Sequence, residues 1–153
     1  MRYGYARVST REQDEARQIK ALKNKGVQEI IIEKASGKNF IDRQEWQKLM
    51  AKVVVDDVIV VKSLDRLGRN NTEIKETFEL LSKKQVYLEF IDNDILNTRK
   101  PITETDKLNQ KLVQPIILHL LGYFAERERE LIRERQTEAY VQLEVDSKGR
   151  KLS

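Results

Sequence analysis

The 153-residue chain contains no cysteine, which excludes disulfide bonds and metal sites built on thiolates. It has a single histidine, His119, so a metal site with several imidazole ligands is also excluded. No apolar run approaches the roughly 20 residues that a membrane-spanning helix requires, and the first residues lack the apolar core of a signal peptide. We therefore expect a cytoplasmic protein with no membrane segment and no metal.

Charge of one sign is not in large excess either. Charged residues form 35% of the chain, but the formal net charge is only +4. This balance is compatible with a polyanionic partner and does not require one. The length of the chain fits one domain with a hydrophobic core.

Glycine is scarce, with six residues, and none lies in residues 8–11, where the first expected strand turns into a helix. Nucleotide-binding α/β domains place a glycine-rich loop at this turn, because its backbone N–H groups must approach the phosphates closely. A nucleotide-binding α/β domain is therefore disfavoured.

Residues 1–91 alternate between short apolar runs and segments with apolar residues at helical spacing. The apolar runs predict strands at 5–9, 30–32, 58–61 and 86–91. The spacing between them predicts one helix from about 11 to 25, a second that begins at 42–45 and a third that follows 70–71. This order predicts an α/β fold with a mostly parallel, four- to five-stranded sheet flanked by helices.

Local signals mark the ends of these helices. Thr10 and Gln13 have the spacing of a capping box at the start of the first helix. Gly26 is expected to end that helix, and Asn70 or Asn71 is expected to cap the third.

A long helix is expected after this α/β region. From Thr105 the helical pattern continues for about 35 residues, and a helix of that length must project from so small a domain or meet a partner. Pro115 is expected to kink this helix or to mark its true start, and His119 is expected to pack against neighbouring apolar residues. An apolar stripe whose burial is expected to drive association includes Ile117, Leu120, Leu121 and Phe124.

Arginines gather where the strands are expected to end. Arg7 and Ser9 alternate onto one face of the first strand. Arg43, Arg66 and Arg69 fall in adjoining loops, and functional groups of parallel sheets gather beyond the carboxyl ends of the strands. The planar fork of arginine binds phosphate oxygens in pairs. Several forks around one serine therefore predict a phosphoryl-transfer site at Ser9.

Each of these residues also has a structural interpretation. Ser9 is a candidate cap for the following helix, and any single arginine can be explained by a surface ion pair. Asp65 is expected to orient Arg66 rather than to act as a base. Glu33 is either another orienting group or only a carboxylate at a strand end. The convergence of all four arginines beside Ser9 is what favours the functional interpretation.

Four motifs occur in order along the chain, namely YARVS at 5–9, KASG at 34–37, DR at 42–43 and LDRLGR at 64–69. Together they resemble the catalytic domain of the small serine recombinases, the resolvase/invertase family. The charged run at 126–135, ERERELIRER, is similar to the long dimerisation helix of that family. The resemblance covers residues 2 to about 139 and rests on the order and separation of the motifs.

The resemblance implies roles for particular residues. The nucleophile that bonds to a DNA 5′-phosphate is matched by Ser9. The arginines around the scissile phosphate are matched by Arg7, Arg43, Arg66 and Arg69. Supporting active-site positions are matched by Tyr5, Lys52 and Asp65, and a position that is usually acidic is matched by Glu33. Positions on the long helix that serve the dimer, the active site or DNA contact are matched by Glu128, Arg129, Glu134 and Arg135.

The activity implied by the resemblance is site-specific DNA recombination, by strand cleavage and religation through a 5′-phosphoserine link. The implied substrate is DNA, and the implied assembly is a homodimer or homotetramer. No cofactor is implied, because the arginines supply the electrostatic stabilisation that metals supply in many nucleases. The alternative is a non-catalytic, dimerising DNA-binding regulator on the same fold. It predicts that Ser9 or the arginines are replaced, and none is.

Two features depart from the family pattern. The stretch between Ile91 and the long helix is longer than in the shortest members. The helix-turn-helix domain with which the family usually reads its DNA site is also not expected in this chain. We therefore expect a catalytic core over 1–104, a long dimerisation helix over 105–140 and a linker or tail over 141–153.

Overall fold

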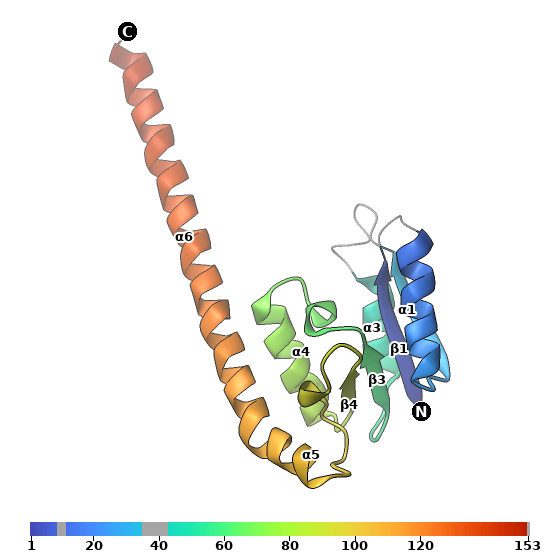
Figure 1. Cartoon of the computed structure of the whole chain (residues 1–153). Coiled ribbons are helices and arrows are strands. Elements are labelled where there is room, and N and C mark those ends of the chain that lie inside the picture. The colour runs from blue at the N-terminus through green and yellow to red at the C-terminus, as the bar shows by residue number, and fades with distance from the viewer. Residues whose placement is uncertain (9–11, 35–42, 153) are drawn as a thin grey trace.

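The structure is a computed structural model that describes residues 1–8, 12–34 and 43–152. Within these residues four parallel strands form one sheet, in the order β2-β1-β3-β4. The strands are β1 (Arg2–Val8), β2 (Glu29–Lys34), β3 (Val58–Val61) and β4 (Tyr87–Phe90). The mostly parallel sheet predicted from the sequence is confirmed (Figure 1).

β1 is an inner strand and pairs on both sides. Its pairing with β2 places Arg7 opposite Glu33, and its pairing with β3 places Tyr5 opposite Val61. Because the strands are parallel, their carboxyl ends meet at one edge of the sheet. The segments that follow β1, β2 and β3 therefore begin at the same end of the molecule.

Helices cover both faces of the sheet. They are α1 (Glu12–Asn24), α3 (Gln44–Lys52) and α4 (Asn71–Lys83). On the face covered by α1, Leu22 shares a buried cluster with Ala6. On the opposite face, Trp46 of α3 and Phe78 of α4 share a larger core with Tyr5. The alternation of Tyr5 and Ala6 between two faces is the one expected from the strand pattern.

Two of the predicted helix ends are confirmed. Gly26 follows α1 with a φ of 70°, a left-handed conformation that glycine adopts without strain. Asn70 caps α4, because its side-chain oxygen accepts the backbone N–H of Glu73. The expected capping box at the start of α1 involves Thr10, which lies outside the described residues.

The last part of the chain is helical almost throughout. A short helix, α5 (Glu104–Leu108), leads through a π-helical segment (Asn109–Val113) into α6 (Gln114–Leu152). Pro115 is the second residue of α6, so it marks the start of that helix, as one of the two expectations had it. Residues 141–152 continue the helix, which therefore runs past the end expected at residue 140. Figure 1 shows α6 running beside α4 and then extending away from the body.

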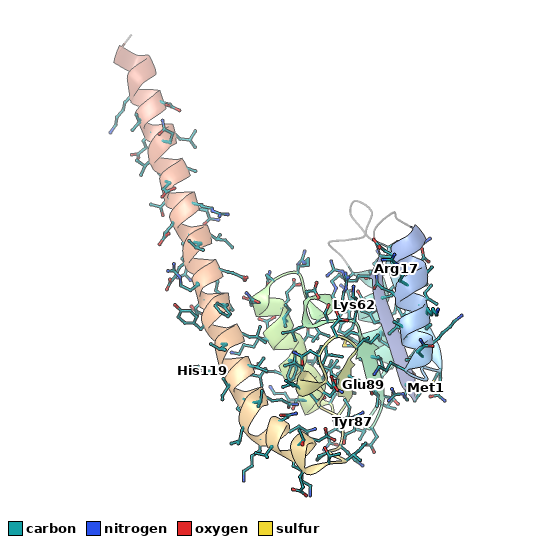
Figure 2. The ribbon with its side chains drawn as sticks, in the orientation of Figure 1. Met1, Arg17, Lys62, Tyr87, Glu89 and His119 are labelled. Atoms are coloured by element: carbon teal, nitrogen blue, oxygen red, sulfur yellow. The ribbon has the colours of Figure 1, made fainter. Side chains whose placement is uncertain are left out.

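The apolar stripe predicted from the sequence lies on two different sides of α6. Ile117 and Leu121 pack against the core beneath α6. Leu120 and Phe124, in contrast, are 47% and 48% exposed. His119 is also exposed, so the expectation that it packs against apolar residues is wrong (Figure 2). No helix in the described part of the chain is long and apolar enough to cross a membrane.

Candidate active site at the carboxyl end of the sheet

Arg7 is the cation closest in sequence to the carboxyl end of β1. It is only 7% exposed, and its backbone carbonyl accepts a hydrogen bond from Gln18 Nε2 of α1 at 3.1 Å. Burial lowers the pKa of the Arg7 guanidinium from its ordinary value, and the nearby cations Arg43 and Arg66 lower it further. Ser9 follows two residues later and lies outside the described residues.

Arg43 connects the start of α3 to the turn that follows β3 through hydrogen bonds. Its Nη1 donates to the carbonyl oxygen of Leu67 at 2.9 Å, and its Nη2 donates to the carbonyl oxygen of Arg66 at 2.8 Å. Both carbonyls belong to a 3₁₀ turn (Leu64–Leu67) that follows β3. Arg43 is 6% exposed, so these charge-assisted bonds are shielded from water. They hold the turn that carries Arg66 against the start of α3.

The backbone of Arg43 adopts an unusual conformation. Its φ of 45° and ψ of 50° are in the left-handed region, which disfavours residues with a Cβ atom. The guanidinium lies 4.8 Å from the centre of the Trp46 ring and 5.7 Å from that of Tyr5. These contacts and the two carbonyl bonds offset a strained backbone, which is a pattern found at functional sites.

Arg66 and Asp65 are adjacent, but the described contacts do not pair them. The Asp65 carboxylate accepts the hydroxyl of Ser63. Arg66 is half-buried, and its Nε is buried without a hydrogen-bond partner among the described residues. The Nε of Arg43 is in the same state. Buried guanidinium N–H groups without partners are costly, and an anion would satisfy them.

Arg69 forms an ion pair with Glu73 of α4. Its Nη2 lies 2.6 Å from Glu73 Oε1, and its backbone N–H donates to Oε2 at 2.8 Å. Arg43 also contributes to the electrostatic stabilisation of the Glu73 carboxylate. The four arginines therefore form one connected group, since Arg43 interacts electrostatically with Arg7 on one side and with Glu73 on the other.

Tyr5 and Glu33 support the group from within the sheet. Tyr5 is 1% exposed and accepts a long bond of 3.5 Å from Arg43 Nη2. Burial raises the pKa of its hydroxyl. The buried carboxylate of Glu33 accepts the backbone N–H groups of Glu45 and Trp46 in the first turn of α3. Glu33 therefore caps the helix that follows Arg43, a role that neither of the two interpretations named.

Lys52 lies apart from these residues. Its Nζ pairs with Glu29, the first residue of β2, at 2.7 Å and lies over the ring of Tyr3. Both partners belong to the amino end of the sheet, where Met1 lies; Lys62, which follows β3, lies at the carboxyl end (Figure 2). The structure does not bring Lys52 to the arginine group, and we leave it out of the site.

The four residues proposed on the long helix also separate. Glu128 accepts hydrogen bonds from the backbone N–H and the side chain of Asn71, at 3.3 and 2.7 Å. Arg129 pairs with Glu126 of its own helix. Glu134 and Arg135 are exposed on the part of α6 that extends away from the body. Of these four residues, only Glu128 is brought to the body beside the arginine group.

Two residues of the site were missed at the level of sequence. Gln18 carries no distinguishing signal there, because its contact is to a backbone carbonyl. Glu73 does carry a signal, since an arginine and a glutamate four residues apart at a helix start form a common ion pair. Together the contacts place Arg43, which is buried, and Arg66, which is half-buried, close to Arg7, two positions before Ser9. Such an arrangement is suited to a phosphate group.

Comparisons with known proteins agree with this arrangement. Residues 2–146 match the family model described as the N-terminal domain of resolvase. The transposon Tn21 resolvase of Escherichia coli is 35% identical over 137 residues, which cover 90% of this chain and 67% of that protein. A resolvase/recombinase of Pseudomonas putida is 36% identical over 149 residues, which cover 96% of this chain and 74% of that protein.

A solved structure supports the fold. The crystal structure of a resolvase family site-specific recombinase from Streptococcus pneumoniae has a TM-score of 0.60 and 23% sequence identity. The likeness covers 92% of this chain and 95% of that one. The family match over most of the chain and the identity to resolvases lead to one conclusion: this chain belongs to the resolvase family of serine site-specific recombinases.

Proposed function

We propose that Ser9 is the nucleophile of DNA strand cleavage and religation, through a 5′-phosphoserine intermediate. In the first step the Ser9 Oγ forms a bond to phosphorus, the bond from phosphorus to the 3′-oxygen breaks, and that oxygen takes up a proton. In the second step the 3′-hydroxyl of a recombining strand attacks the phosphoserine, and Ser9 regains its hydroxyl proton. The number of phosphate ester bonds is unchanged, so no external energy source is needed.

The observation that carries this proposal is the burial of three arginines beside the end of β1. Arg7 and Arg43 are nearly inaccessible, and Arg66 is half-buried. Burial, Arg43 and Arg66 lower the pKa of the Arg7 guanidinium, whereas Tyr5 and Asp65 act in the opposite direction. A phosphate would add further negative charge beside these cations and so stabilise their burial. The phosphate of DNA is the anion that this family acts on, and its charge increases in the transition state.

We assign different roles in the reaction to the four arginines. Among the described residues, Arg66 has a buried donor without a hydrogen-bond partner, and we assign it to direct stabilisation of the phosphoryl transition state, together with Arg7 and Arg69. Arg43 is fastened to carbonyl oxygens, and we assign it to holding the Arg66 turn in place. Because these groups supply positive charge, we propose that cleavage proceeds without a metal ion.

We also propose that α6 joins copies of the chain. The helix exposes apolar side chains along one side, namely Ile116, Leu120, Tyr123, Phe124 and Leu131, and Leu112 of the preceding π-helical segment is exposed as well. Burial of each such side chain is worth about 1.5–3 kcal/mol. A second copy would cover this row, giving a homodimer or a homotetramer. In this proposal residues 1–104 form the catalytic core, and the helix after it serves association.

The experiment uses the full chain fused after Ser153 to a DNA-reading domain of known specificity. The substrate is a labelled duplex with two inverted sites for that domain and a nick, so that cleavage releases a short strand and traps the covalent product. We expect a protease-sensitive, slowly migrating band on a denaturing gel, in the presence of EDTA. Ser9→Ala should abolish the band, and Arg66→Ala should reduce its rate of formation by a hundredfold or more.

Arg127→Ala is the matched control for Arg66→Ala. Arg127 is an exposed arginine of α6 whose ion pair in the described structure is with Glu130 of the same helix, so the variant should cleave at the wild-type rate. A covalent band from Ser9→Ala would refute the assignment of the nucleophile. Loss of the band in EDTA would refute the metal-free reaction. A folded wild-type chain that binds DNA but never forms the band would favour the non-catalytic regulator instead.

A further inference from the structure

The carboxylate of Glu73 holds Arg69 at three nitrogen atoms. It accepts the backbone N–H of Arg69 at 2.8 Å, the Nε at 3.0 Å and the Nη2 at 2.6 Å. The pKa of Glu73 is lowered, chiefly by the side-chain hydrogen bonds from Arg69. The backbone N–H of Glu73 is held in turn by Asn70 at 2.9 Å. Both ends of the ion pair are therefore fixed to the first turn of α4.

The loop before Arg69 is pressed against the same turn. A Cβ atom on Gly68 would lie 2.6 Å from the Cβ of Glu73 and 2.7 Å from the backbone nitrogen of Ile74. Contacts that short do not occur between unstrained atoms, so only glycine permits the loop to pass so close. The position of the loop, and with it the position of Arg69, therefore follows the first turn of α4.

The long helix forms hydrogen bonds with this turn through Glu128. Glu128 of α6 accepts the backbone N–H of Asn71 at 3.3 Å and its side-chain Nδ2 at 2.7 Å. Asn71 is the first residue of α4. From 129 to 149 every residue of α6 is exposed. Glu128 therefore marks the point at which the helix leaves the body. Its partner Asn71 lies two residues after Arg69 in the chain.

We propose that Glu73 is a positioning residue for Arg69, and that Glu128 holds the turn from which Glu73 acts, so that the placement of the long helix sets the placement of Arg69. This inference rests on the proposed function only where it assigns Arg69 to the phosphate. The coupling is carried by fixed contacts between named residues, all of which lie in the described structure. It connects the element that serves association to one cation of the reaction site.

The arrangement predicts opposite effects on binding and on chemistry. A carboxylate beside a phosphate site repels DNA, so Glu73→Gln should leave the DNA concentration at half-saturation unchanged or lower it. The same variant removes the carboxylate that accepts three N–H groups of Arg69, so it should slow cleavage at saturating DNA at least tenfold. A residue with a purely structural role would weaken both binding and cleavage, because its loss disorders the fold.

The first test observes Arg69 directly, without DNA. The Nε–H signal of Arg69 in the ¹⁵N NMR spectrum of the full chain is identified by its absence in Arg69→Lys. We expect this signal to move and to exchange faster with solvent in Glu73→Gln, and to move in Glu128→Ala. Glu79→Gln is the matched control on α4, since Glu79 forms an ion pair of the same spacing with Lys75. Glu130→Ala is the control on α6. Neither control should move the signal.

The second test measures cleavage with the nicked duplex and the fused full chain, in single turnover. Glu73→Gln should cleave at least tenfold more slowly and Glu128→Ala at least threefold more slowly, while both controls stay within twofold of the wild type. Should Glu73→Gln fail to fold, Glu73→Asp retains the charge on a shorter arm. It should show the same change of the Arg69 signal in weaker form.

Each outcome decides between the two proposals. An Arg69 signal that is unchanged in Glu73→Gln overturns the positioning role, whatever the wild type does with DNA. If the wild type cleaves, an equal cleavage rate in Glu73→Gln overturns it as well. If the wild type forms no covalent product but the Arg69 signal still responds to Glu73 and Glu128, the positioning stands and the proposed chemistry fails.

Discussion

Arg43 combines burial, charge and a left-handed backbone at a single position. Its side chain reaches across to two carbonyl oxygens of the turn that carries Arg66. The planar fork donates to the two acceptors from two separate nitrogen atoms, whereas a lysine ammonium must donate to both from a single nitrogen. The role of Arg43 is therefore tied to the shape of its side chain and not to its charge alone.

Arg43→Lys should lower the free energy of unfolding by about 1–3 kcal/mol, because a buried carbonyl oxygen loses its donor. The measurement is urea denaturation followed by circular dichroism. Arg17→Lys is the control, since Arg17 is an exposed arginine on α1, and it should leave the midpoint unchanged. Equal stability of Arg43→Lys and the wild type would show that the two carbonyl bonds contribute little.

The ion pair of Glu73 makes a small part of the stability depend on pH. The pKa of Glu73 is lowered in the folded chain from its ordinary value of 4.5. The stabilisation is therefore present above that value and is lost as the pH falls through the lower, folded-state pKa. Because Arg69 is partly exposed, the contribution should be only about 0.5 kcal/mol.

Wild type should accordingly be more stable than Glu73→Gln at pH 7, and the difference should vanish in acid, once the carboxylate is protonated. Urea denaturation of both chains over a series of pH values checks this. The control is Glu79→Gln, whose ion pair is longer at 3.6 Å and more exposed. A difference between wild type and Glu73→Gln that is the same at all pH values would show that it does not come from the charge.

Among the elements, α6 has two sides with different tasks. Leu121 is 6% exposed beneath the helix, and its neighbour Leu120 is 47% exposed on the other side. The helix therefore uses one side to pack on α4 and leaves the other for a partner. These two adjacent leucines allow the tasks to be separated by substitution.

Leu121→Ala should lower the free energy of unfolding by about 2–4 kcal/mol, because it leaves a cavity between α6 and the core. Leu120→Ala should cost less than about 0.5 kcal/mol in the same measurement at a concentration where the chain is a monomer. Thermal or urea unfolding of both variants measures the two losses of stability. Equal losses would mean that α6 does not pack on the body in solution as it does here.

The sequence allowed each described strand, and the start of α4, to be predicted, for reasons that are local. Val58–Val61 is a buried apolar run. Asn70 is a residue type favoured at helix starts, and its side chain accepts the backbone N–H of Glu73 as a cap does. The end of α6 was not predicted, because the polar residues with Gly149 near the end of the chain read as a linker although the helix continues through them. Local pattern alone does not show where an exposed helix stops.

The candidate site was predictable only in part. Arg7 and Arg66 could be placed because they adjoin strand ends, and parallel strands bring their ends together. The partners of Arg43 are backbone carbonyls, which leave no mark in a sequence. The contact of Glu128 with Asn71 joins residues 57 positions apart. Lys52 was expected by resemblance, but it stands at the far end of α3 from Arg43.

For the molecule as a whole, the exposed side of α6 predicts self-association. Sedimentation velocity should show a dimer or a tetramer whose proportion rises with concentration. The double variant Leu120→Glu and Phe124→Glu should sediment as a monomer, since it places charge in the middle of the apolar row. Ile95→Glu is the control, because Ile95 is 46% exposed on a different part of the surface. A wild type that remains monomeric at high concentration would contradict the proposed interface.

The central claim is that Ser9 bonds to DNA beside the arginine group, and mass spectrometry of the trapped covalent product tests it most directly. The fused full chain is reacted with the nicked duplex, the product is digested with protease and nuclease, and the modified peptide is sequenced. The account predicts a nucleotide 5′-phosphate on Ser9 and on no other residue. A nucleotide found on a tyrosine, on a histidine or on another serine, such as Ser63, would contradict it.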